Sequence, residues 1–135
     1  MISENRVFDA NLETMPLIMR FIEDMSEALP FKTAYAVRLV CEEILINIVN
    51  YAYPGGGGQL SLLWENDTHS RELLIKFEDA GIPFDPLEKE TPKLDAPIAE
   101  RKIGGLGIHM IRSLTDTANY ERRDNKNILT VTKRY

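Results

Sequence analysis

An acid and two amides share one side of an otherwise apolar segment, Cys41 to Asn50. If this segment is a helix, Glu43 and Asn47 are stacked one turn apart, and Asn50 follows on the same side. A carboxylate beside amide oxygens suits a hard cation such as Mg²⁺ and the activation of a hydroxyl nucleophile. A solvated helix face with an incidental asparagine would also explain the pattern, so this stretch alone does not decide the chemistry.

Two glycine clusters further along the chain have the spacing of a nucleotide site. Asp79 is followed by Gly81 after a predicted strand. A carboxylate there can accept a hydrogen bond from an exocyclic amine such as that of adenine, and the glycine lets a flat ring approach the backbone. Gly104, Gly105 and Gly107 open a predicted helix, where free N–H groups and the helix dipole favour an anion. Taken separately, these clusters are also typical of an ordinary turn and of a glycine-rich helix start.

A long segment without apolar periodicity, residues 82–103, separates the two clusters. It contains four prolines and nine charged residues. Around twenty residues without structure inside a compact domain usually form a functional lid or a disordered segment. Arg101 and Lys102 lie at its end, beside the glycines, where they are either simply solvated or assist the binding of a triphosphate.

The elements that must position these residues follow from the periodicity. Helical spacing predicts helices from about Leu12 to Leu29, ending before Pro30, from about Thr33 to Tyr53 and from about Leu106 to Leu114. The buried side of the second helix would comprise Val37, Val40, Cys41, Ile44, Ile48 and Tyr51. Strands are predicted near Arg6–Phe8, Leu60–Glu65, Leu73–Glu78, Ala118–Arg122 and Ile128–Lys133. This order indicates an α+β, two-layer sandwich: a mostly antiparallel sheet with helices on one face.

The bulk properties fit one soluble domain. A chain of 135 residues with 44% apolar and 27% charged residues is most economically a single domain, residues 1–135. The net charge of −5 and the lack of a basic stripe argue against direct nucleic-acid binding. The lone Cys41 excludes an internal disulfide and a cysteine-rich zinc site. The sequence shows neither a membrane-span pattern nor a signal-peptide pattern, so we expect a cytoplasmic protein without membrane attachment.

Taken in order, the motifs resemble those of the histidine-kinase-like ATPase superfamily, which has the Bergerat fold with a long ATP lid. Glu43 to Asn47 is similar to its N box, Asp79 to Phe84 to its adenine-binding box, and Gly104 to Gly107 to its phosphate box at the end of the lid. The Glu-x-x-x-Asn-x-x-x-x-Ala-Tyr form, through Tyr53, and the closing Val131-Thr132-Lys133 look most like bacterial anti-sigma-factor serine/threonine kinases. The resemblance covers nearly all of the chain.

The resemblance implies ATP and Mg²⁺ as ligands and gives each motif residue a role. Glu43 would be the general base that takes the proton from an attacking seryl hydroxyl or water. Asn47 would hold the Mg²⁺ that bridges the phosphates, and Asp79 would bind the adenine amino group. Further nucleotide contacts would come from Asn50, Gly81, Phe84, Arg101, Lys102, Gly104, Gly105, Leu106 and Gly107.

Two departures from the family pattern bear on these expectations. The family often has Gly-Thr at the start of the last strand, and the Thr helps the adenine-binding Asp; here Lys126-Asn127-Ile128 stand instead. Because Ile128 cannot supply a hydroxyl, we expect reduced nucleotide affinity. Arg20 lies one residue away from the position of an arginine that contacts partners in the family.

The function that the resemblance implies is that of an ATP-dependent serine/threonine-protein kinase and anti-sigma factor in a partner-switching system. It would phosphorylate a small anti-sigma-factor antagonist on Ser or Thr and sequester a sigma factor, and a homodimer is compatible with this role. The alternative is a nucleotide-gated protein-binding module without phosphotransfer. Glu43 favours the enzyme, whereas the altered Lys126–Ile128 segment favours the module. An ATPase of gyrase or chaperone type is less favoured, because the sequence shows no transducer or dimerisation segment.

Overall fold

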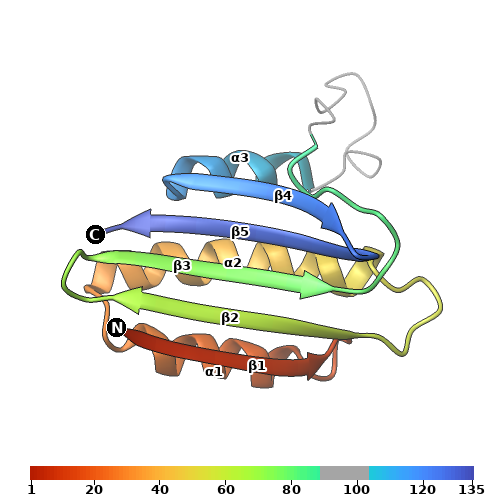
Figure 1. Cartoon of the computed structure of the whole chain (residues 1–135), viewed down its shortest axis with the longest axis horizontal. Helices are drawn as coiled ribbons and strands as arrows, with labels where there is room; N and C mark the ends of the chain where they lie inside the picture. The colour runs from red at the N-terminus through yellow and green to blue at the C-terminus, as the bar shows by residue number, and fades with distance from the viewer. Residues whose placement is uncertain (89–103) are drawn as a thin grey trace.

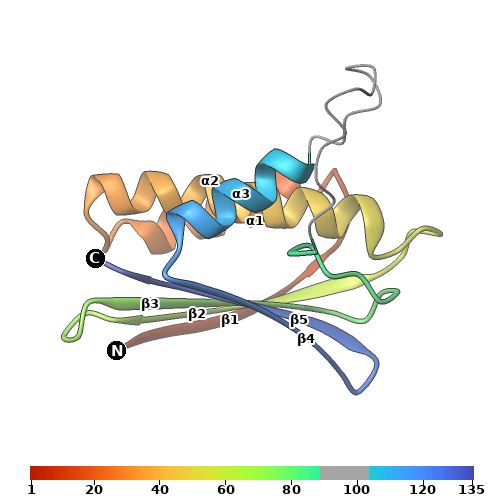
Figure 2. The same ribbon diagram turned by 90° about the horizontal axis from the view of Figure 1, so that it is seen from above.

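The computed structural model describes residues 1–88 and 104–135, and in this part of the chain three helices cover one face of a five-stranded sheet (Figure 1). Seen edge-on, the helices form one layer and the sheet forms the other (Figure 2). The predicted α+β two-layer class is therefore confirmed. In chain order the elements are β1 (Ile2–Asp9), α1 (Met15–Ser26), α2 (Phe31–Tyr51), β2 (Gln59–Asp67), β3 (Glu72–Asp79), α3 (Gly104–Leu114), β4 (Thr117–Arg123) and β5 (Lys126–Arg134).

All strand pairs in the sheet are antiparallel, in the order β1-β2-β3-β5-β4. Side chains of β2 and β3 alternate between buried and half-buried because successive residues of a strand point to opposite faces. The buried set faces the helices and comprises Leu60, Leu62, Trp64, Leu73, Ile75 and Phe77. In the β3–β5 register Asp79 lies directly opposite Asn127.

The helical layer packs on the sheet through apolar side chains. α2 is the central helix, and its buried residues form a continuous side that includes the polar Asn47. The exposed polar side of α1 carries Glu23, which pairs with Arg38 of α2 at 3.3 Å. Such an exposed pair adds little to stability, so the two helices are held together mainly by apolar burial. None of the described helices has the length and apolar character that a membrane crossing needs.

Two predicted boundaries and one predicted core residue differ clearly from the structure. β1 spans eight residues rather than three; its side chains are almost all exposed, so no apolar alternation marks it. α1 starts at Met15 because Asn11 Oδ1 accepts hydrogen bonds from Thr14 in a preceding turn, and Leu12 is left 68% exposed. Tyr51, predicted to lie in the core, is 47% exposed at the last position of α2.

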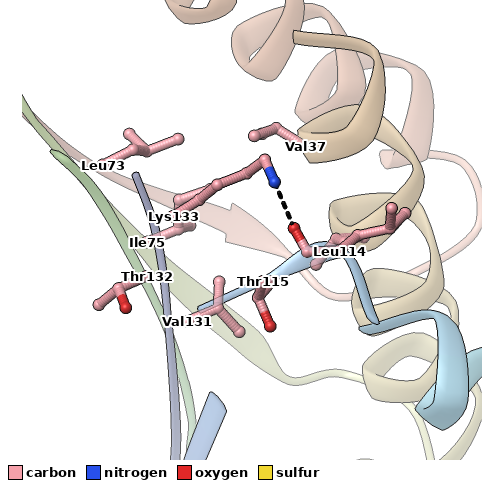
Figure 3. Close-up of a pocket in the computed structure, with 9 residues that line it drawn as sticks. Val37, Leu73, Ile75, Leu114, Thr115, Val131, Thr132 and Lys133 are labelled. Carbon is pink, nitrogen blue, oxygen red and sulfur yellow. Dashed lines mark hydrogen bonds between the residues drawn. The ribbon is translucent and has the colours of Figure 1, made fainter. Parts of the chain in front are cut away.

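The end of α3 is fastened to the sheet by Lys133 of β5. Its Nζ donates a hydrogen bond to the Leu114 carbonyl oxygen at 2.8 Å (Figure 3). A cation at a helix C-terminus pairs with the otherwise unbonded carbonyls and with the negative end of the helix dipole. The cavity beneath this contact is apolar and measures only about 10 Å³, so it is a packing gap rather than a ligand site.

Candidate functional site

The predicted site residues come together at one end of the sandwich. The C-terminal half of α2, the end of β3, the start of α3 and the turn between β4 and β5 all lie at this end (Figure 1; Figure 2). The β4–β5 turn is a two-residue one, formed by Asp124 and Asn125 with φ of 53° and 61°. Positive φ at both positions is typical of the tight turns that match the twist of a hairpin.

Glu43 and Asn47 form the acid–amide pair that their spacing predicted. Glu43 is half-buried, Asn47 is 7% exposed, and their side chains are joined by a hydrogen bond. Burial raises the pKa of the Glu43 carboxyl above its usual value, and the nearby charge of Glu42 adds to the rise, whereas the hydrogen bond with Asn47 opposes it. A carboxylate with a raised pKa is a stronger base, which is what proton abstraction from a hydroxyl requires.

Gly107 of α3 lies directly against this carboxylate. A Cβ at Gly107 would stand 1.9 Å from Glu43 Oε1 and 2.2 Å from its Cδ, far inside any allowed contact. The absence of a side chain therefore allows α3 to approach the Glu43 carboxylate. Phosphate contact, the role that the resemblance implies for Gly107, remains a prediction, because no ligand is present.

Asp79 is the second carboxylate of the site and is only 5% exposed. Its Oδ1 accepts hydrogen bonds from the Gly81 N–H and from Asn127 Nδ2, both at 2.9 Å. Among the described residues no donor is recorded for Oδ2. In that part of the chain, the fully buried side-chain atoms without a hydrogen-bond partner are Trp64 Nε1 and Asn66 Nδ2. Asp79 Oδ2 is not one of them, so we infer that a ligand can reach it. A reachable carboxylate oxygen can accept a hydrogen bond from an exocyclic amine.

The structure gives Gly81 a packing role in addition to the predicted one. A Cβ at Gly81 would stand 2.2 Å from the Ala52 carbonyl oxygen, at the end of α2. The next residue, Ile82, donates its N–H to the same oxygen at 2.9 Å. Tyr53 adds a second link, because its hydroxyl accepts a hydrogen bond from the Ala80 N–H at 2.8 Å. Glycine is thus required for the loop after β3 to lie against the end of α2.

Asn127 is the site residue that sequence reasoning missed. The Lys126-Asn127-Ile128 segment led us to expect reduced nucleotide affinity, because Ile128 has no hydroxyl; in the structure the Asn127 amide supplies a donor to Asp79 instead. The expected reduction in nucleotide affinity stays a prediction. The Asp-Asn turn at residues 124–125 signals a hairpin. However, only the pairing register of β3 with β5 brings Asn127 opposite Asp79, which lies 48 residues earlier in the sequence.

The first part of the predicted lid is fixed in place. Leu87 is 7% exposed and belongs to the core, and its N–H donates to Asp85 Oδ1 at 2.8 Å. Arg112 of α3 donates to the Leu87 carbonyl oxygen at 3.3 Å. Residues 82–88 thus contain no helix or strand, as expected, but Leu87 ties them to the core. Residues 89–103, with Arg101 and Lys102, lie outside the described part of the chain.

The other predicted contacts lie around these two carboxylates with varied exposure. Phe84 is half-buried and its ring centroid lies 5.2 Å from that of Tyr51, so the two rings form an aromatic wall beside the loop. Asn50 is exposed one turn after Asn47. Gly104, Gly105 and Leu106 form the first turn of α3, and the surroundings of the Leu106 side chain lie outside what the structure describes.

The donor set at this end fits ATP with Mg²⁺ better than a metal held by the protein alone. Within residues 1–88 and 107–135 no three His, Cys, Asp or Glu side chains gather as a metal site. Mg²⁺ at phosphate-transfer sites is commonly held by one or two protein groups together with the phosphates. Asn47 would supply such a group for Mg²⁺, and Asp79 Oδ2 would face the adenine ring of the nucleotide.

Comparison with known proteins adds family and fold to this geometry. Residues 8–133 match a family model described as "Histidine kinase-like ATPase domain". The serine/threonine-protein kinase BtrW of Bordetella bronchiseptica is 31% identical over 98 residues, which are 73% of this chain and 68% of that protein. A histidine kinase domain of the blue-light-activated kinase from Erythrobacter litoralis superposes with a TM-score of 0.57 at 21% identity. That superposition covers 78% of this chain but only 46% of the kinase chain, and it supports the fold alone.

Proposed function

Because the chain belongs to the histidine kinase-like ATPase domain family, we propose that it is an ATP-dependent serine/threonine-protein kinase that uses Mg²⁺. The proposal includes a role as a cytoplasmic anti-sigma factor of a partner-switching system. In that role the protein would phosphorylate a small antagonist protein on Ser or Thr, and it would hold a sigma factor. The similarity to a protein named as a serine/threonine kinase supports the transfer reaction.

The observation that carries the proposal is the half-buried Glu43 with its raised pKa. A domain that only binds nucleotide needs no base, whereas transfer to a seryl hydroxyl needs a group to take its proton. Asn47 forms a hydrogen bond with the Glu43 carboxylate, and in this proposal its amide oxygen would bind Mg²⁺. Bound Mg²⁺ would neutralise charge on the phosphates, so that the residues of the chain mainly orient the nucleotide and accept one proton.

Asp79 would fix the nucleotide at the other end of the site. Its carboxylate is held by two N–H donors and would offer its second oxygen to the adenine amino group. Base recognition and proton abstraction are thus assigned to different carboxylates on different elements, β3 and α2. This separation makes the two steps testable by different variants.

The test is the transfer of ³²P from [γ-³²P]ATP to small antagonist proteins encoded near the gene, chosen as those that bind this protein. Glu43→Gln keeps the size and the hydrogen bond to Asn47 but removes the base, so we expect a loss of about 10²- to 10⁴-fold in rate. Nucleotide affinity should be unchanged, because the base acts on the attacking hydroxyl. Glu13→Gln removes an exposed carboxylate outside the site and is the matched control, for which we expect transfer near the wild-type rate.

One result would overturn the kinase proposal, and a second would overturn only the role of Glu43. If the wild-type protein binds MgATP and an antagonist yet never labels it, the chain is a nucleotide-gated binding module. If Glu43→Gln labels the antagonist as fast as the wild type does, Glu43 is not the base.

A further inference from the structure

We infer that Asn127 is the positioning residue for base recognition: it holds Asp79 so that only Oδ2 is offered to an exocyclic amino group. The inference deepens the proposed nucleotide site and depends on it. In the family pattern a threonine hydroxyl assists the adenine-binding Asp, and here the Asn127 amide would take that role. The family motifs did not assign Asn127 to the site.

The orientation of the Asn127 amide is dictated by its neighbours. Nδ2 donates to two groups that can only accept, Asp79 Oδ1 at 2.9 Å and the Ile82 carbonyl oxygen at 2.7 Å. Oδ1 accepts from groups that can donate, which are the Phe84 N–H, the Tyr120 hydroxyl and Arg122 Nη1. If the amide were rotated by 180°, Oδ1 would face the two acceptors and Nδ2 would face the three donors, and these hydrogen bonds would be lost. Both amide hydrogens are therefore committed.

This network leaves Asp79 one arrangement. Asp79 and Asn127 are each 5% exposed, so water cannot readily replace their hydrogen bond. With the Gly81 N–H and Asn127 Nδ2 both on Oδ1, rotation of the Asp79 carboxylate would break two bonds at once. Oδ2 is thereby oriented for the nucleobase before any nucleotide binds. An acceptor that is already fixed loses less conformational entropy on binding.

Arg122 extends the network to the loop that passes the site. Its Nη1 donates to the Gly81 carbonyl oxygen at 2.8 Å and to Asn127 Oδ1 at 3.2 Å. The β4–β5 hairpin therefore holds both the acceptor of the site and the loop beside it. Selectivity for an amino group on the base is then set by the hairpin, through Asn127, as well as by Asp79.

The test compares ADP with purine riboside 5′-diphosphate, which lacks only the 6-amino group, by calorimetric titration in the presence of Mg²⁺. We expect the wild-type protein to bind ADP about tenfold or more tightly than the analogue, as for one charge-assisted hydrogen bond. In Asn127→Ala this ratio should fall toward one, because ADP affinity drops while analogue affinity stays. A merely structural role would weaken both nucleotides equally.

Asn127→Asp covers the case in which the alanine variant does not fold. It keeps the size and the oxygen that accepts from the Phe84 N–H, but it places a carboxylate oxygen against Asp79 and removes the donor. We expect the ratio to collapse here too. Asn119→Asp makes the same change at an exposed position of β4 and should keep the wild-type ratio.

The outcomes are distinguishable. If the wild-type protein binds neither nucleotide, the nucleotide site itself is wrong and the inference falls with it. If it binds ADP selectively and folded Asn127→Asp keeps that selectivity, the site stands and the inference about Asn127 is wrong.

Discussion

At the scale of single residues, the two carboxylates of the site have different surroundings and are suited to different tasks. Glu43 is half-buried and has a raised pKa, which suits a group that must gain a proton. Asp79 is buried and accepts two N–H donors on one oxygen, which suits an acceptor that is held in one orientation. In the proposed function the environment, rather than the residue type, would separate the general base from the group that recognises adenine.

The raised pKa of Glu43 makes stability depend on pH in a definite direction. Below about pH 4.5 the carboxyl is neutral in both the folded and unfolded states. As the pH rises through the raised pKa, the unfolded state releases its proton first, so ionisation favours unfolding and the free energy of unfolding falls. Glu43→Gln should lack this fall and become the more stable protein near neutral pH.

Urea unfolding at a series of pH values from 4 to 8 measures this difference. Glu13→Gln, which removes an exposed carboxylate, should not show the same gain toward neutral pH. A difference between Glu43→Gln and the wild type that does not grow across the series would contradict burial as the cause of the pKa rise.

Gly107→Ala should slow transfer through its effect on Glu43. The new Cβ would overlap Glu43 Oε1, so the flexible carboxylate must move away. A misplacement of about 1 Å in a reacting group can cost about 10²-fold in rate. Single-turnover transfer measures the loss, and adding Gly107→Ala to Glu43→Gln should slow the reaction no further. A further loss in the double variant would show that Gly107 acts by another route.

Local spacing was enough to predict Glu43 with Asn47, and Asp79 with Gly81, because each pair lies within one turn of helix or one loop. It was not enough for Asn127, whose partner is 48 residues away in the sequence. It was also wrong for Tyr51, since a position near a helix end can follow the apolar period and still lie in solvent. Long-range register therefore had to come from the structure.

At the scale of the elements, α3 is the part held at both ends. Near its start Gly107 lies against Glu43, and its last carbonyl accepts a hydrogen bond from Lys133 of β5. Helical spacing predicted the three helices, and strand signals predicted the five strands, because apolar patterns in the sequence reflect which side of each element is buried. The full length of β1 was not predictable, since an exposed edge strand is defined by its backbone pairing with β2 and not by its side chains.

Lys133→Met should loosen the end of α3. Methionine keeps the apolar stem but leaves the Leu114 carbonyl without its cation, so we expect a loss of about 1 kcal/mol in the free energy of unfolding. Urea denaturation measures it. Lys76→Met, at a half-buried position of β3, is the control and should change stability by less than about 0.5 kcal/mol. Equal effects of the two substitutions would mean that the contact with α3 does not stabilise the helix.

At the scale of the whole molecule, the described residues of the candidate site lie at one end of the sandwich. The helices and sheet bury a continuous core, while the residues that could bind a nucleotide meet where α2 ends, α3 begins and the β4–β5 hairpin turns (Figure 2). A ligand bound there would contact several elements at once. Nucleotide binding should therefore raise the stability of the entire domain.

The most direct measurement is the melting temperature of the wild-type protein and of Asp79→Asn, with and without MgADP. At a concentration about 100 times Kd, a ligand that binds only the folded state adds about 2.7 kcal/mol, which for a domain of this size is a shift on the order of 10 °C. In Asp79→Asn the amide oxygen can still accept from the Gly81 N–H and from Asn127, so its nitrogen would take the place of Oδ2 and face the base with a donor. We predict a clear shift for the wild type and almost none for the folded variant. No shift in the wild type, or equal shifts in both proteins, would contradict a nucleotide site built on Asp79.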